Sequence, residues 1–134
     1  MKMQTSIEIK KLVQPVFGKH KDYLVFAYLF GSTAQDKVFP LSDIDIAVYF
    51  SKGESDFCSG MKILLYTDIS RALQRNDVDV VVLNKTKNIM LLDEIVRHGI
   101  VLFDKDIHLR LDFESNILHN AFDFKSQRMA VMGI

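Results

Sequence analysis

Along the chain, segments with apolar residues at helical spacing alternate with segments that are continuously apolar. This pattern predicts helices alternating with strands. Thr5 and Glu8 are spaced as a capping box before an apolar stripe that contains Leu12, Val13, Val16 and Phe17. Runs rich in β-branched and aromatic residues predict the strands. We expect helices at 5–20, 56–75, 88–98 and 106–125, strands at 23–30, 43–50, 78–83 and 100–103, and a short helix at 32–36.

Two punctuating residues refine this outline. Pro15 is expected to kink or shorten the first helix, because proline lacks the backbone N–H and its ring crowds the preceding turn. Gly99 stands where a C-terminal cap would end the helix at 88–98. Since the sequence has no internal repeat or linker, we expect one α/β domain over 1–134, with a core at about 23–103 and a small mixed β-sheet on which the helices pack.

Composition narrows the class of protein. The 134 residues are 49% hydrophobic and 25% charged, which is enough for one compact domain and excludes a disordered chain. Lys plus Arg number 17 and so do Asp plus Glu, so the chain lacks the basic surplus typical of a nucleic-acid binder. A nucleic-acid template is therefore not expected, whereas near-zero net charge is compatible with a protein partner or with self-association.

The sequence also bears on location. The longest apolar run, 24–30, is too short to span a bilayer, and the first residues lack the apolar stretch of a secretion signal. The single Cys58 has no internal partner for a disulfide. We therefore expect a cytoplasmic protein with no membrane segment.

Candidate chemistry lies where two predicted strands meet a tight turn. Gly31 and Ser32 follow the strand at 23–30, and ten residues later come Asp43 and Asp45. Residues two apart on a strand share a face, so the two carboxylates project together and favour a cation between them. Glycine allows a sharp turn that exposes backbone N–H groups, and a serine hydroxyl adds a donor, which suits a phosphate group.

The strand pattern suggests a third acid for this candidate site. Asp79 is the charged position in the strand at 78–83 and would lie beside the first two acids if the strands are neighbours. Carboxylates gathered at one end of a sheet suit one or two Mg²⁺ ions that also bind substrate phosphates. The alternative is that Gly31-Ser32 is a plain loop and the acids are solvated; the ordered combination of all these features favours the metal site.

The pattern Gly31-Ser32, ten residues, Asp43-Ile44-Asp45 and a later strand acid resembles the DNA polymerase beta nucleotidyltransferase superfamily, and the small size is similar to its minimal nucleotidyltransferase (MNT) branch. The resemblance covers about 23–103. It implies that Asp43, Asp45 and Asp79 bind Mg²⁺ and act in catalysis and that Gly31 and Ser32 hold the triphosphate of ATP. It further implies an antitoxin whose partner is a helical HEPN toxin, modified with AMP on a hydroxyl, with tyrosine as the expected acceptor.

The chain departs from the branch in one respect. An Arg-Gly pair commonly follows the Gly-Ser-x-Ala segment, but here Gln35 and Asp36 follow Ala34, with Lys37 as a possible replacement cation. The departure keeps two alternatives open: a non-catalytic antitoxin that neutralises its partner by binding, and, as a weaker one, a small-molecule nucleotidyltransferase of the antibiotic type. Whether the departure abolishes turnover, which nucleotide is used and how many AMP units are transferred stay open at this stage.

Overall fold

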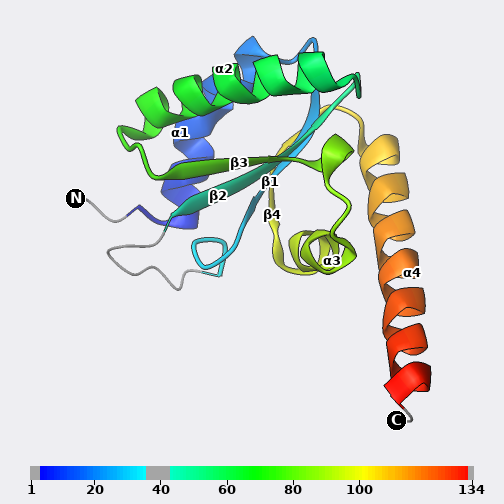
Figure 1. Ribbon diagram of the computed structural model, residues 1–134. Coiled ribbons are helices and arrows are strands. Elements are labelled where there is room, and N and C mark those ends of the chain that lie inside the picture. The colour runs from blue at the N-terminus through cyan, green and yellow to red at the C-terminus, as the bar shows by residue number, and fades with distance from the viewer. Residues whose placement is uncertain (1–3, 36–42, 133–134) are drawn as a thin grey trace.

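The computed structural model describes residues 4–35 and 43–132. In chain order its elements are α1 (Ser6–Lys19), β1 (Leu24–Phe30), β2 (Ile44–Phe50), α2 (Ser55–Leu73), β3 (Val78–Val82), the 3₁₀ turn η1 (Leu83–Lys85), α3 (Ile89–His98), β4 (Ile100–Asp104) and α4 (Ile107–Met132). The strands form one sheet in the order β3-β2-β1-β4, in which β2 and β3 are parallel and the other neighbours antiparallel. The predicted α/β fold with a small mixed sheet is confirmed (Figure 1).

Helices cover both faces of this sheet. Along β2, Ile44, Ile46 and Val48 belong to the hydrophobic cluster that includes α1 and α2. Ala47 and Tyr49 belong to the other cluster, with residues of α3 and α4. Every residue of β1 is buried, as its continuous apolar run predicts for a central strand. The odd-numbered side chains of β2 therefore face the side of α3 and α4.

Two predictions about local structure are wrong. Residues 32–35 form a turn, closed by the Gln35 N–H donating to the Ser32 carbonyl at 3.2 Å, and not a helix; Asp36 lies outside the described residues, as do the connector positions after it. Helix α2 ends at Leu73 and not at Arg75, because Gln74 adopts a left-handed conformation with φ 54°. The Gln74 and Arg75 amides then bond back to Arg71 and Ser70, which is the Schellman arrangement of a helix end.

The terminal helices also differ from expectation. Pro15 does not shorten α1, which continues to Lys19; the carbonyl that loses its bond belongs to the exposed Lys11, where water can replace the partner. Leu12 in the predicted stripe is 41% exposed, and Ile9 is buried instead.

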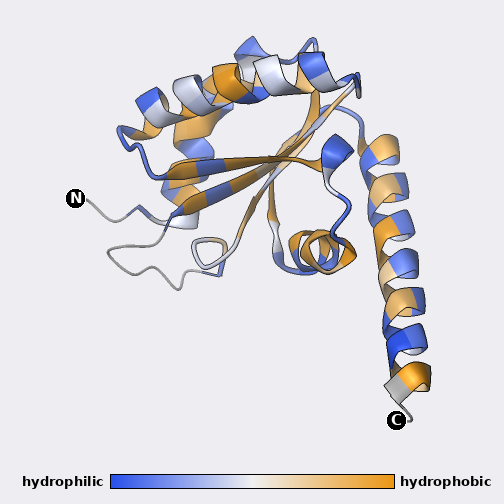
Figure 2. Cartoon of the chain, in the orientation of Figure 1, coloured by the Kyte–Doolittle hydropathy of each residue, from blue (hydrophilic) through white to orange (hydrophobic). Residues whose placement is uncertain are grey.

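Helix α4 is longer than predicted. It runs to Met132, and its C-terminal half extends beyond the rest of the fold (Figure 1). There Phe122 and Val131 are exposed, and hydrophobic and hydrophilic positions alternate along the helix (Figure 2). No described helix combines the length and apolar character needed to cross a membrane.

Candidate active site

The three predicted acids meet at one end of the sheet. In the parallel register of β2 and β3, Asp45 lies directly beside Asp79. Both have the same strand parity as residues facing α3 and α4, so their side chains share a face. Asp43 immediately precedes β2 on the same parity and is exposed, as is Asp79, whereas Asp45 is half-buried. The structure thus brings together the acids that the sequence singled out.

Gly31 lies against this group. β1 ends at Phe30, which pairs with Asp45, and Gly31 then turns with φ +78°, a conformation that side chains rarely adopt. A Cβ atom placed on Gly31 would lie 2.5 Å from Asp45 Oδ2, in overlap with the carboxylate. Glycine is therefore required here twice, for the backbone angle and for the close approach of the turn to Asp45.

Asp45 is the acid of this group whose ionised form is disfavoured by its surroundings. Burial raises the pKa of the Asp45 carboxyl to about 6, and the negative charges of Asp79 and Asp43 contribute to the increase. Within 4–35 and 43–132, no three His, Cys, Asp or Glu side chains form a ready-made metal site. The acids are close enough to influence one another's charge, and their oxygen atoms are the ligands that Mg²⁺ prefers.

Contacts from outside the motif hold the strand ends in place. The Ile44 N–H donates to the Asp77 carbonyl at 2.9 Å, which ties the starts of β2 and β3 together. Arg75, whose side chain is 5% exposed, donates to both Asp77 carboxylate oxygens, from Nε at 2.7 Å and from Nη2 at 2.5 Å. The hydrogen bond to Asp77 raises the pKa of the Arg75 guanidinium, and the charge of Asp43 contributes, so Arg75 is a cation next to the acids.

Arg75 was not predicted as a site residue, because the expected cation was one that follows the Gly-Ser turn. The available signal was an Arg and an Asp two positions apart, directly before the strand that carries Asp79. The expected substitute, Lys37, lies outside the described residues. Thr33 was also missed: it is fully buried, and its Oγ1 donates to the Asp43 carbonyl at 3.4 Å, joining the turn to the start of β2.

Ser32 and Gln35 lie on the turn itself. Ser32 is half-buried, and its carbonyl accepts the Gln35 amide that closes the turn. The Gln35 side chain reaches α3, where its Nε2 donates to Glu94 Oε1 at 3.4 Å. At the position where the MNT branch commonly has an arginine, this chain therefore has a neutral amide that is hydrogen-bonded to a carboxylate of α3.

The site thus consists of a glycine-serine turn beside paired strand aspartates. Residues 11–108 match the family described as Polymerase beta, Nucleotidyltransferase, which is most of the chain. The chain belongs to this family of nucleotidyltransferases, and the predicted enzyme class is confirmed. No curated protein sequence matches it.

Several solved structures with the same fold are described as toxin–antitoxin proteins. One, described as a toxin–antitoxin with AMP-PNP, is 24% identical with a TM-score of 0.73, over 92% of this chain and 95% of that one. Another is a tri-AMPylated Shewanella oneidensis HEPN toxin in complex with MNT antitoxin: 22% identity, TM-score 0.68, and 93% of each chain covered. A third, the toxin–antitoxin MntA–HepT, is 22% identical with a TM-score of 0.67, over 93% of this chain and 94% of that one. At these identities the likeness establishes the fold.

Proposed function

We propose that the chain is a Mg²⁺-dependent adenylyltransferase that moves AMP from ATP to a hydroxyl group, a tyrosine, of a cognate HEPN toxin, and that it acts as the antitoxin. The observation that carries this proposal is the position of Asp45, which lies beside Asp79, two residues after Asp43, and against the Gly31 turn. The family membership of the chain and its likeness to complexes with an AMPylated toxin and with AMP-PNP support it.

Each site residue has a separate role in the proposed transfer of AMP. Asp43 and Asp45, with Asp79, would supply the oxygen ligands for Mg²⁺, which would offset the charge that develops on the phosphates. The Gly31 turn and the Ser32 hydroxyl offer donors for the β- and γ-phosphates. Asp79 would either bind the metal or accept the proton of the acceptor hydroxyl. The hydroxyl oxygen bonds to the α-phosphorus, the bond from that phosphorus to the bridging oxygen breaks, and pyrophosphate leaves.

We propose the cytoplasm as the location and a protein, not a nucleic acid, as the acceptor.

The test is transfer of label. The purified chain is mixed with the protein encoded by the neighbouring gene, ATP labelled at the α-phosphate and Mg²⁺. We expect label on the partner, absent when Asp43→Asn and Asp45→Asn are combined and absent when the label is on the γ-phosphate. A folded pair that transfers no label would overturn the enzymatic proposal.

A non-catalytic antitoxin is the second candidate, and Gln35 favours it. Because Gln35 is neutral and bonds to Glu94, the turn lacks a cation at this position for the triphosphate. If the Asp43→Asn/Asp45→Asn variant still neutralises the partner, binding alone accounts for the function. If neutralisation is lost while the complex persists, chemistry is required. A small-molecule nucleotidyltransferase would instead transfer label to an antibiotic or metabolite without any protein partner.

A further inference from the structure

Residues 74–77, which join α2 to β3, form neither a helix nor a strand, yet hydrogen bonds hold them at several points. The first two amides of this segment bond back to carbonyls in the last turn of α2. The Asn76 carbonyl accepts a hydrogen bond from the Tyr66 hydroxyl of α2 at 3.1 Å. The Asp77 carbonyl accepts the Ile44 amide of β2 at 2.9 Å. The segment is therefore fixed to α2 on one side and to the start of β2 on the other.

The Arg75 side chain adds a contact within this segment. It is 5% exposed and donates to both carboxylate oxygens of Asp77, from Nε and from Nη2. Two parallel hydrogen bonds fix the orientation of the two groups as well as the distance between them. Rotation of residue 77 would break these bonds, so the ion pair keeps the Asp77 carbonyl directed at the Ile44 amide.

This ion pair is a weak source of stability. When a guanidinium and a carboxylate are largely removed from water, the loss of hydration offsets most of their attraction. The pair also lies next to the acidic site: after the hydrogen bond to Asp77, the negative charge of Asp43 is a further cause of the raised pKa of Arg75. Its place beside the acids favours a role in their geometry.

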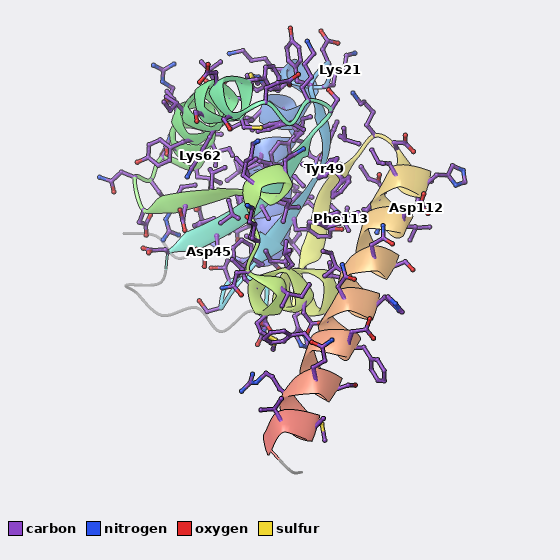
Figure 3. The ribbon with its side chains drawn as sticks, turned by 45° about the vertical axis from the view of Figure 1, so that its right-hand side comes forward. Lys21, Asp45, Tyr49, Lys62, Asp112 and Phe113 are labelled. Carbon is purple, nitrogen blue, oxygen red and sulfur yellow. The ribbon has the colours of Figure 1, made fainter. Side chains whose placement is uncertain are left out.

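The position of residue 77 affects the spacing of the acids. Ile44 lies between Asp43 and Asp45, and Asp77 lies two residues before Asp79. Asp45 lies near the start of β2, where β3 runs beside it and Asp79 is its partner in the register (Figure 3). A change in the hydrogen bond between Ile44 and Asp77 would therefore move the acids on either side of Ile44 relative to Asp79.

We propose that Arg75 and Asp77 are positioning residues of the metal site. Their ion pair fixes the hydrogen bond that joins the starts of β2 and β3, and so sets the spacing of the three aspartates that would bind Mg²⁺. Replacement of a group that orients metal ligands commonly weakens metal binding about 10- to 100-fold. The inference rests on the proposed function and adds two residues to its site.

Binding of Mn²⁺ alone, followed by the relaxation of water protons without ATP or partner, tests the proposal. Arg75→Gln should weaken Mn²⁺ binding about tenfold. The charge of Arg75 would act in the opposite direction, because removal of a nearby positive charge by itself strengthens the binding of a cation. Hydrogen exchange of the Ile44 amide in the metal-free protein should become faster, since its acceptor is held less firmly.

Arg75→Lys provides a second measurement that leaves the net charge unchanged. A lysine at this position retains the attraction to Asp77 but lacks the planar fork that makes two parallel hydrogen bonds. Binding of Mn²⁺ should therefore weaken by about threefold, between the unchanged protein and Arg75→Gln.

Arg110→Gln is the matched control. Arg110 lies at the start of α4, with 15% of its side chain exposed, and donates from Nε to Asp104 at 2.7 Å. Asp104 is the last residue of β4, which is the opposite edge of the sheet from β3. Loss of this ion pair should lower the melting temperature without weakening Mn²⁺ binding, whereas loss of the Arg75 pair should weaken Mn²⁺ binding.

Unchanged or tighter Mn²⁺ binding by Arg75→Gln would overturn the inference, and so would an equal loss in Arg110→Gln. Transfer of AMP to the partner separates this inference from the proposed function. Normal Mn²⁺ binding by both Arg75 variants, together with AMP transfer, contradicts the positioning role alone. Weakened Mn²⁺ binding by these variants, without AMP transfer by any of the proteins, contradicts the enzymatic function alone.

Discussion

Two groups of carboxylates in this fold differ in whether positive charges balance them. On the α4 side, the buried Tyr28 hydroxyl donates to Glu114 Oε2 at 2.6 Å, and Arg110 bonds to both Glu114 and Asp104. Each of those acids has a cationic partner. At the other group, Asp45 and Asp79 lie side by side with no ion pair among the described residues, and the pKa of Asp45 is raised.

The difference separates stabilisation from function. The Arg110 group satisfies a buried hydroxyl and fixes α4 on the sheet, so its charges contribute to folding. The Asp45 group places like charges together, which opposes folding. Groups that disfavour the folded state and are nevertheless brought together point to a ligand that compensates them. The predictions below test whether the two groups respond in opposite directions.

Asp45→Asn should cause the largest loss of activity, while stability should stay the same or increase. Loss of a metal ligand should lower the rate of AMP transfer about 10³-fold, since metal stabilisation of the transition state amounts to several kcal/mol. Removal of a repelling charge should leave the melting temperature unchanged or raise it. Both are measured on the same preparation, with Asp112→Asn, an exposed acid on α4, as the control. A strong loss of stability would show that Asp45 supports the fold.

Glu114→Ala should give the reverse result. It leaves the buried Tyr28 hydroxyl without its acceptor and removes one partner of Arg110, so the free energy of unfolding should fall by about 2 kcal/mol. AMP transfer per folded molecule should stay close to that of the unchanged protein. Glu114→Gln retains an acceptor for Tyr28 and should lose less stability in urea denaturation. Equal losses for the two variants would contradict the role of the hydroxyl bond.

Gly31→Ala should affect both properties. The positive φ and the overlap with Asp45 Oδ2 force the turn or the carboxylate to move, at a cost of about 1–2 kcal/mol in unfolding free energy. ATP binding, followed by calorimetry, should weaken as well. Gly60→Ala in α2 is the matched control, because nothing lies within 4 Å of its Cβ position and alanine favours a helix. If both substitutions stabilise the protein, the Gly31 turn is not constrained as described.

The smallest effect is expected for Asp68, a carboxylate with cationic partners, and it should appear in the dependence of stability on acid pH. Asp68 accepts hydrogen bonds from His20 Nε2 at 2.8 Å and Lys19 Nζ at 3.2 Å, and the bond from His20 is the main cause of its lowered pKa. A lowered pKa in the folded state stabilises the protein above the ordinary pKa of 3.8, and this contribution is lost as the pH falls through the folded value. Asp68→Asn should therefore reduce stability by about 1 kcal/mol at neutral pH and flatten its decline below pH 3.8. Parallel pH curves for the two proteins would contradict this assignment.

Local patterns in the sequence predicted most of the fold because they have local causes. The continuous apolar run of β1, the Thr5 cap and the Asn88–Gly99 helix boundaries all depend on neighbouring residues, and the structure has them. The end of α2 was misplaced because Gln74 adopts an angle usually left to glycine. The apolar residues of α2 do not all face the sheet: Leu64 is 52% exposed, whereas Cys58, Met61, Leu65, Ile69 and Leu73 are buried.

The candidate site was predictable where it follows from strand parity, as for Asp43 and Asp45. The pairing of Asp45 with Asp79 required the strand order, which the pattern alone left open. Arg75 was missed although its partner Asp77 lies two positions away, because a cation was expected after the Gly-Ser turn. Thr33 was missed because its hydrogen bond to the Asp43 carbonyl joins two separate segments. The roles of Asp43, Asp45, Asp79, Gly31 and Ser32 in metal and nucleotide binding stay predictions.

The most direct measurement is paramagnetic broadening by Mn²⁺, used in place of Mg²⁺, together with a non-hydrolysable ATP analogue. The account predicts that the amide resonances of Asp43, Asp45, Asp79 and Gly31 broaden first, that Lys21 and Asp112 do not, and that Asp45→Asn removes the effect. Uniform broadening, or none at the ends of β2 and β3, would contradict a metal–nucleotide site formed by these aspartates.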